Sequence, residues 1–308
     1  MLAYLIRKSL IFVSSLLIIV SLTFFLMKLL PGDPFSEEQA LRHDMHESLR
    51  QQYGMHQPWW MQYRDYLAHL FRGQLGYSFK YPGRSINSII QEGFPVSAQL
   101  GLQAFCMALL FGISLGVLSA LKPHLWQDRL LLILTTLGLS VPSFILATLL
   151  QYALAIYFPL FPLARWGTFA QTILPSLALS AAPMAFIARL TRTGLLEALQ
   201  TDYMKLARAK GLSLSYCLWR HALRNALLPV LSYLGPLLAN VLVGSFVIEK
   251  IFSIPGLGQW FVNSVANRDY SLITGLTLFY SIILLGAIFL VDLIYGIWDP
   301  RIRLIRKQ

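Results

Sequence analysis

Charged residues are scarce in this sequence. Only 13% of its 308 residues are charged, whereas soluble domains average about 25%. Hydrophobic residues make up 56% of the chain. This composition argues against an ordinary water-soluble globular domain.

Cysteine is nearly absent as well, with only Cys106 and Cys217 in the chain. Cys106 lies in a long apolar stretch and Cys217 in a basic loop, so we do not expect a disulfide between them. A disulfide framework is therefore excluded.

Motifs that carry chemistry are also missing. The sequence has no G-x-x-x-x-G-K-[ST] loop to hold ATP phosphates, and it has no nucleophile elbow or metalloprotease motif. His43 and His46 stand three residues apart, but no further ligand accompanies them, so two solvated histidines are favoured over a metal site. We expect a chain that is not an enzyme and binds no cofactor or metal of its own.

Long apolar stretches are abundant. A helix needs about 20 residues to cross the hydrocarbon core of a bilayer, and six charge-free stretches meet or nearly meet that length. They predict an all-α polytopic membrane protein with six transmembrane helices. The stretches are 9–27, 93–121, 130–164, 166–188, 225–248 and 270–291.

Two of these stretches differ from a simple span, one in its length and the other in its prolines. The stretch 130–164 is too long for one span, so we expect one helix followed by an apolar turn around Pro159 and Pro162. The stretch 166–188 contains Pro175 and Pro183, and a buried or re-entrant piece remains an alternative there. Because proline is tolerated within membrane helices, we favour a span.

The basic residues gather in alternate loops. The N-terminus, the loop after 93–121, the segment 189–224 and the C-terminal tail hold most of them. Positively charged short loops stay in the cytoplasm, so both termini are expected there. The net charge of +11 then indicates topology and anionic lipid rather than nucleic acid, which would require a basic soluble face.

The segment from Thr201 to Pro229 is basic although apolar stretches flank it. The pattern predicts two short helices. Thr201 or Asp202 can cap the start of the first helix, and Gly211 can end it. Ser213 or Ser215 can cap the start of the second helix. In the first helix, one face is expected to carry Tyr203, Leu206 and Ala207, and another Lys205 and Arg208. Such a helix suits docking into a groove on a soluble partner, although a loop that only sets topology is an alternative.

The remaining organisation follows from the spans. We expect an N-terminal transmembrane helix at 1–28, an external subdomain at 29–92, a five-helix core at 93–298 and a cytoplasmic tail at 299–308. Within the core, the loop 201–228 lies in the cytoplasm. A short surface helix is expected at 259–267.

Several motifs, in order, carry a family resemblance. They are PGDP (31–34), GQLGYSFKY (73–81), ARAKGL (207–212), RHALRNALLP (220–229), PGLGQ (255–259), NRDY (267–270) and DPRIR (299–303). The chain resembles the B-type transmembrane subunit of oligopeptide ABC importers, in the family of binding-protein-dependent peptide and nickel permeases. The loop 201–228 resembles that family's EAA loop, except that Lys205 stands where the acid that names the motif would be.

The resemblance implies the type I, MetI-like importer fold, a place in the bacterial inner (plasma) membrane and a set of partners. These partners are a second homologous permease, two ATP-binding subunits that carry ATP and Mg²⁺, and an extracytoplasmic peptide-binding protein. The helix at 203–212 would be the coupling helix that docks on an ATPase. The residues implied in coupling are Asp202, Tyr203, Lys205, Leu206, Ala207, Arg208, Ala209, Gly211, Leu212, Arg220 and His221.

Small and helix-breaking residues in the third and fifth spans suggest a translocation path, because broken helices can expose backbone to a cavity. Tight packing alone is the alternative for each of them. Glu249 can instead pair with Lys250 or a neighbour. The path residues expected are Ser140, Pro142, Ser143, Gly235, Asn240, Gly244 and Glu249.

Three other functions stay open. A dipeptide or nickel importer would share the coupling loop. A secondary transporter would need repeat symmetry and midplane charges, whereas the one acid inside a predicted span, Asp292, lies off-centre and is expected to pair with Arg189 or Arg192. An intramembrane enzyme would need a catalytic pair within the spans, and none stands out.

Overall fold

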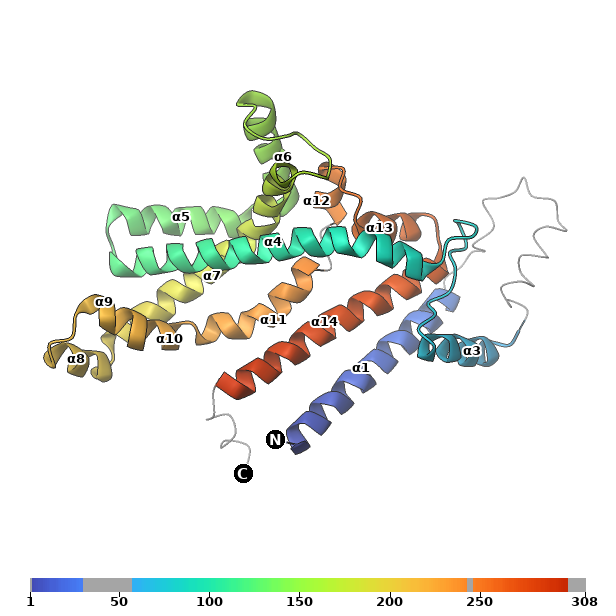
Figure 1. Cartoon of the computed structure of the whole chain (residues 1–308), viewed down its shortest axis with the longest axis horizontal. Helices are drawn as coiled ribbons and strands as arrows, with labels where there is room; N and C mark the ends of the chain where they lie inside the picture. Colours follow the sequence, from blue (N-terminus) through green and yellow to red (C-terminus); the bar gives the residue numbers. More distant parts are fainter. Residues whose placement is uncertain (1, 30–56, 243–245, 299–308) are drawn as a thin grey trace. The chain divides into compact units, whose positions relative to one another are not determined.

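A computed structural model describes residues 2–29, 57–242 and 246–298 of the chain (Figure 1). Within these ranges the elements are helical, apart from one isolated antiparallel bridge between Tyr77 and Ser85. The expectations for 31–34, His43, His46, Gly244 and 299–303 fall outside the described residues. The side chain of Asp292 also lies outside the description.

Among the described residues, five helices are long and apolar enough to cross a membrane, and there are six such spans if the bent pair of helices is one span. This agrees with the six apolar stretches of the sequence. The spans comprise α1 (Leu2–Leu29), α4 (Ile86–Leu121), the pair α5 (Trp126–Ser140) and α6 (Ser143–Leu150) with η1 (Gln151–Tyr157), α7 (Phe169–Gln200), α11 (Leu228–Leu242) with α12 (Phe246–Ile251), and α14 (Tyr270–Trp298).

The third predicted span consists of two helical pieces and not of the one helix expected. The expected turn around Pro159 and Pro162 follows them, since residues 158–168 are not helical. Helix α5 stops at Ser140, and the chain bends by 110° before α6 and η1 continue to Tyr157. Pro142 explains the break, because it has no N–H and keeps the preceding residue extended. Val141 is accordingly at φ −82° and ψ 120°.

Helix α7 is continuous over 32 residues although Pro175 and Pro183 lie inside it. The re-entrant alternative for this stretch is therefore not what the structure shows. Helices α4 and α7 approach closely: a Cβ added at Gly116 would lie 2.6 Å from the Ala188 carbonyl oxygen. Small residues permit such contact between membrane helices.

The chain divides into two compact units, which we describe separately. Unit 1 comprises residues 1–95 and 256–283, and unit 2 comprises 96–255 and 284–308. Unit 1 contains α1, α3 (Trp59–Phe71), α13 (Leu257–Ala266) and the first part of α14. Its apolar core is built by residues of α4's first turns, α13 and α14, namely Ile86, Ile89, Ile90, Leu257, Leu272 and Leu276.

Helix α3 packs on α1 through aromatic rings in unit 1. The Phe24 and Tyr66 rings stack with centroids 5.6 Å apart. Burial raises the pKa of the Tyr66 phenol to about 12, and a hydrogen bond with Thr274 acts in the opposite direction. The α3 helix is thus fastened to α1 and to α14 within this unit.

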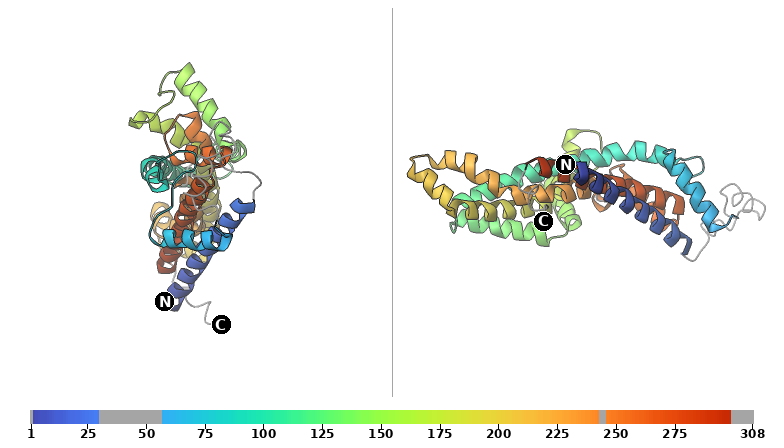
Figure 2. Two further views of the ribbon diagram at one scale, coloured as in Figure 1. Left: turned by 90° about the vertical axis from the view of Figure 1, so that its right-hand side faces the viewer. Right: turned by 90° about the horizontal axis from the view of Figure 1, so that it is seen from below.

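Unit 2 contains the elements that the sequence analysis assigned to coupling. They follow α7 as α8 (Asp202–Ala209), α9 (Leu214–Cys217), the π-helical η2 (Leu218–Ala222) and α10 (Leu223–Ala226). These elements and the turn between α4 and α5 lie at the same end of unit 2 (Figures 1 and 2). That end of unit 2 contains the candidate site.

Candidate functional site: the coupling segment and its support

We call residues 201–228 the coupling segment. Its first helix, α8, begins after Thr201, whose backbone is extended at φ −71° and ψ 155°. The expected side-chain cap is absent, because the Thr201 hydroxyl donates to the Ala198 carbonyl at 2.6 Å instead. Asp202 accepts a hydrogen bond from Lys205 Nζ at 2.8 Å on the exposed surface.

Gly211 ends this helix, as the sequence predicted. Its φ of +80° is in the left-handed region, and its N–H donates to the Arg208 carbonyl. A Cβ at this position would meet nothing within 4 Å. The requirement for glycine is therefore conformational and not steric.

The next helix also begins as predicted. The Ser213 hydroxyl accepts a hydrogen bond from the Tyr216 N–H at 3.3 Å, which is the pattern of a helix N-cap. Helix α11 then opens at Leu228, one residue before Pro229. Proline is tolerated in a first helical turn because its missing N–H has no partner there.

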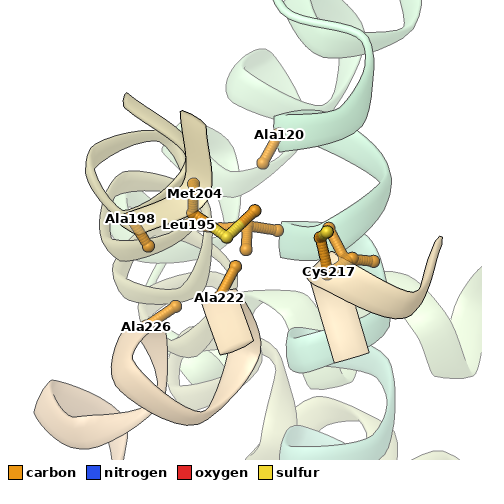
Figure 3. Close-up of a cluster of buried hydrophobic side chains, with 8 residues drawn as sticks. Ala120, Leu195, Ala198, Met204, Cys217, Ala222 and Ala226 are labelled. Atoms are coloured by element: carbon orange, nitrogen blue, oxygen red, sulfur yellow. The ribbon is translucent and has the colours of Figure 1, made fainter. Parts of the chain in front are cut away.

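Met204 anchors α8 to the rest of unit 2. It is 1% exposed and lies among Leu195, Ala198 and Ala222 (Figure 3). The complete buried cluster, which we call the anchor core, draws on the ends of α4 and α7 and on the coupling segment: Ala120, Leu195, Ala198, Met204, Cys217, Leu218, Ala222 and Ala226.

The two faces of α8 differ in part from the expectation. Tyr203, Leu206 and Ala207 were predicted on one face, but Ala207 packs against the anchor core while Tyr203 and Leu206 are 40% and 58% exposed. The sequence analysis did not single out Met204, although its position between Tyr203 and Ala207 in an amphipathic helix could have indicated it. Tyr203 also accepts a hydrogen bond from Asn225 Nδ2 at 3.0 Å, which joins α8 to α10.

An apolar and basic surface is left exposed on the coupling segment. Tyr216 and Trp219, which the sequence analysis did not assign, are 51% and 67% exposed. His221 is half-buried, and its ring lies 6.0 Å from the Tyr216 ring. The other predicted coupling residues on this surface are all exposed: Lys205, Arg208, Ala209, Gly211, Leu212 and Arg220.

A buried ion pair lies beside the anchor core. Asp128, 1% exposed, accepts hydrogen bonds from Arg192 Nε at 2.7 Å and Arg192 Nη2 at 2.8 Å. Its carboxylate also accepts from the Ser119 hydroxyl and, at 2.9 Å, from the His124 N–H. We call Ser119, Asp128 and Arg192 the clasp; it joins α4, α5 and α7.

Sequence reasoning missed the clasp. It treated Asp292 as the expected partner of Arg189 or Arg192, but Asp128 is the partner that Arg192 has. Arg189 instead donates to the hydroxyls of Thr135 and Thr136 on α5. The available signal was an acid in the first turn of α5, where the helix dipole favours negative charge.

A second buried carboxylate, Asp269, lies in unit 1. It caps α14 by accepting from the Leu272 N–H at 3.1 Å, and it also accepts from the N–H groups of Phe79 and Lys80 at 3.1 and 3.3 Å. The Ser78 hydroxyl is its fourth donor. Two of the motifs singled out in the sequence, 73–81 and 267–270, are thus bonded to one another.

The predicted path residues occupy several environments in unit 2. Ser140 is exposed at the end of α5, and Pro142 and Ser143 form the bend. Gly235 is buried against α14, where a Cβ would lie 3.2 Å from Val291; Asn240 is exposed on α11. Their role in a path remains a prediction.

Glu249 is buried and accepts a hydrogen bond from the Ser97 hydroxyl at 2.7 Å. The alternative of a pair with Lys250 is not realised, because Lys250 is exposed and forms no ion pair within the part of the chain that the structure describes. Glu249 therefore joins α12 to α4 within unit 2.

Comparison with solved structures shows the fold of the chain. Two solved structures share the fold. An inward-facing MetNI methionine ABC transporter has a TM-score of 0.54 and 18% sequence identity, and the match covers 68% of this chain and 96% of that chain. An amino acid ABC transporter has a TM-score of 0.55 and 16% sequence identity, and the match covers 68% of this chain and 94% of that chain. The chain is thus a helical, multi-pass membrane protein with the fold of ABC-importer permeases.

Sequence comparison gives the family. Residues 112–304 match the model described as binding-protein-dependent transport system inner membrane component, and residues 1–101 match the N-terminal model of such components. The chain belongs to this family. It is 46% identical to the dipeptide transport system permease protein DppB of Bacillus subtilis, over 99% of both chains. It is 41% identical to the oligopeptide transport system permease protein OppB of Escherichia coli K12, over 98% of this chain and 100% of that one.

Proposed function

We propose that this chain is one transmembrane subunit of an ATP-driven importer for oligopeptides, which an extracytoplasmic binding protein delivers. It works beside a second homologous permease and two ATPase subunits. ATP and Mg²⁺ bind to the ATPases, and this chain performs no catalysis. Both termini and the coupling segment lie in the cytoplasm.

This proposal rests on one observation, which is how the coupling segment is anchored on one side and exposed on the other. Its helix α8 is held from one side by Met204 and presents Tyr203 and Leu206 on the other, among exposed cations. An amphipathic helix laid into a hydrophobic groove is a common mode of recognition. A helix that is rigidly anchored and exposed on its apolar side is suited to transmit movement from such a partner.

The proposed transport mechanism is alternating access. Closure of the ATPases on ATP moves α8, and α8 moves the spans to which it is anchored. Docking can shift the permease between its two states only if the docking free energy differs between them. The path residues Ser140, Pro142, Ser143, Gly235, Asn240, Gly244 and Glu249 are proposed to act in the spans that open.

The substrate class rests on the relatives and on the motifs. The names of the relatives include both dipeptide and oligopeptide systems, and the chain is more similar to the dipeptide permease of Bacillus subtilis than to the oligopeptide permease of Escherichia coli. Dipeptide import is therefore the second candidate. Nickel import by a member of the same family, and secondary transport, are the remaining alternatives.

The test is purification of the tagged chain from its native membrane, followed by mass spectrometry of the proteins that stay bound. We expect a second permease and two ATPases. The recovered complex is then reconstituted in liposomes with its binding protein, and ATP-driven uptake of labelled dipeptide, pentapeptide and Ni²⁺ is compared. Uptake without ATP, driven by an ion gradient, would establish secondary transport and overturn the proposal.

A further inference from the structure

The clasp connects three helix ends that are far apart in the sequence. Asp128 and Arg192 are 64 positions apart, and Ser119 and Arg192 are 73 apart. Arg192 Nε lies 2.7 Å from Asp128 Oδ1 and 3.0 Å from Ser119 Oγ, so α4, α5 and α7 share one hydrogen-bonded cluster. The second Asp128 oxygen receives Arg192 Nη2 and the His124 N–H.

The geometry of this ion pair restrains orientation as well as distance. Two parallel N–H···O bonds between a guanidinium and a carboxylate fix the planes of both groups. Asp128 is 1% exposed and the Arg192 side chain 19% exposed, so water has little access to compete for these bonds. A sliding or rotation of α7 against α5 would have to break both bonds at once.

The clasp is continuous with the anchor core. Ala120 follows Ser119 directly on α4, and Leu195 lies one turn beyond Arg192 on α7. The anchor core in turn contains Met204 of α8 (Figure 3). The clasp and the anchor core are therefore neighbours along both α4 and α7, which connects the coupling helix to the first turn of α5.

We propose that Ser119, Asp128 and Arg192 are positioning residues, which make the coupling segment and the adjoining ends of α4, α5 and α7 move as one rigid body. The clasp transmits the displacement of α8 to three spans together. Without it, α8 and α7 would move while α5 stayed behind. This inference rests on the proposed function, because it concerns how the ATPase stroke reaches the spans.

A distance measurement tests the rigid body directly. Spin labels are placed on Arg129→Cys in α5 and Ser215→Cys in α9, both at exposed positions, in a chain carrying Cys106→Ser and Cys217→Ala. The label distance is recorded in the assembled importer without nucleotide and with ATP trapped. We expect one narrow distribution that is the same in both states. A distribution that shifts with ATP in the chain with an intact clasp would overturn the proposal.

Clasp variants provide the functional test. In the reconstituted importer, Asp128→Asn and Arg192→Gln should lower the peptide taken up per ATP hydrolysed by at least about fivefold, the lower end of usual coupling between sites. The ATPases should remain bound, because the exposed surface of α8 is unchanged. The double variant should lose no more than the more severe single variant, since both remove the same pair.

Two controls separate coupling from folding. Arg129→Gln removes the neighbouring exposed cation, which has no ion pair in the described part of the chain, and should keep the normal uptake per ATP. Ser119→Ala removes one hydroxyl and should reduce that ratio less than Asp128→Asn does. If either of the single pair variants fails to assemble, Ser119→Ala and the label distances still decide the matter.

The outcomes distinguish this inference from the proposed function. Suppose that the unaltered importer takes up peptide with ATP, and that the assembled clasp variants take up the same amount of peptide per ATP hydrolysed. The proposed role of the clasp is then wrong, and the proposed function stands. If the unaltered importer shows no ATP-driven uptake while its label distance stays constant, the rigid body stands and the proposed function falls.

Discussion

Two buried carboxylates, Asp128 in unit 2 and Asp269 in unit 1, are stabilised by different kinds of partner. Asp128 faces a guanidinium, and its contacts join side chains of three helices. Asp269 has no ion pair within the described residues, and three of its four donors are backbone N–H groups. Both are 0–1% exposed, so burial alone does not distinguish them.

The difference lies in what each carboxylate holds in place. An ion pair between side chains on separate helices sets the positions of those helices relative to one another. A carboxylate cradled by N–H groups instead sets the conformation of a loop, here 78–80, at the start of α14. We therefore expect loss of Asp128 contacts to affect communication between helices, and loss of Asp269 contacts to remain local.

The largest effect is expected from Arg192→Ala. This change leaves Asp128 as a buried carboxylate without its cation, and breaking a buried pair in this way costs about 3–5 kcal/mol. The measurement is the thermal unfolding midpoint of the purified complex in detergent. Arg192→Ala/Asp128→Ala should be more stable than Arg192→Ala, because no uncompensated charge remains. A double variant as unstable as the sum of the single ones would show that the two residues do not act as a pair.

Met204→Ala tests whether apolar packing, beside the ion pair, holds the coupling segment. Removing a fully buried methionine side chain should cost about 2–4 kcal/mol through lost contacts and a cavity. Leu206→Ala is the matched control on the same helix, since Leu206 is 58% exposed and its loss should change stability by less than about 0.5 kcal/mol. The control should instead weaken retention of the ATPases in a pull-down. The reverse pattern would mean that α8 docks by the face which the structure buries.

Asp269→Asn examines the other carboxylate. An asparagine keeps the size but turns an NH₂ group toward N–H donors, so we expect a loss of about 1–3 kcal/mol. Hydrogen exchange followed by mass spectrometry should show faster exchange at Phe79 and Lys80, with no change in α8. Glu92→Gln, which breaks only the exposed pair with Arg84, serves as the control. Faster exchange in α8 would remove the distinction between the two carboxylates.

The spans could be predicted from the sequence, because charge-free runs of membrane length have few alternative structures. Pro142 was noted as a helix-breaking residue, but the bend was not predicted there, because proline is also tolerated within membrane helices, as Pro175 and Pro183 are in α7. The turn that the sequence analysis expected around Pro159 and Pro162 is present, since residues 158–168 are not helical. Which of several prolines breaks a helix depends on the packing around it.

The coupling segment was located by its basic residues and its glycine, whereas its support was not found. Asp128 stands just before one apolar run and Arg192 just after another, and no local pattern links residues so far apart. The same holds for Ser78 and Asp269, which belong to separate motifs. Side-chain pairing across helices follows from the fold and not from spacing along the chain.

Gly211→Ala is expected to have the smallest effect, and it separates conformation from contact in the coupling segment. A non-glycine residue at a left-handed φ costs about 1–2 kcal/mol, and the free space around Gly211 means that no clash adds to this. Gly211→Asn should cost less and Gly211→Val more, in the order of their tolerance for positive φ. The readout is ATPase retention in a pull-down together with the unfolding midpoint.

Gly286→Ala is the matched control. This helical glycine also has free space around it, but its φ is not positive, so alanine there should be neutral or slightly stabilising. Equal effects of alanine at the two glycines would show that the left-handed turn after α8 does not contribute to docking.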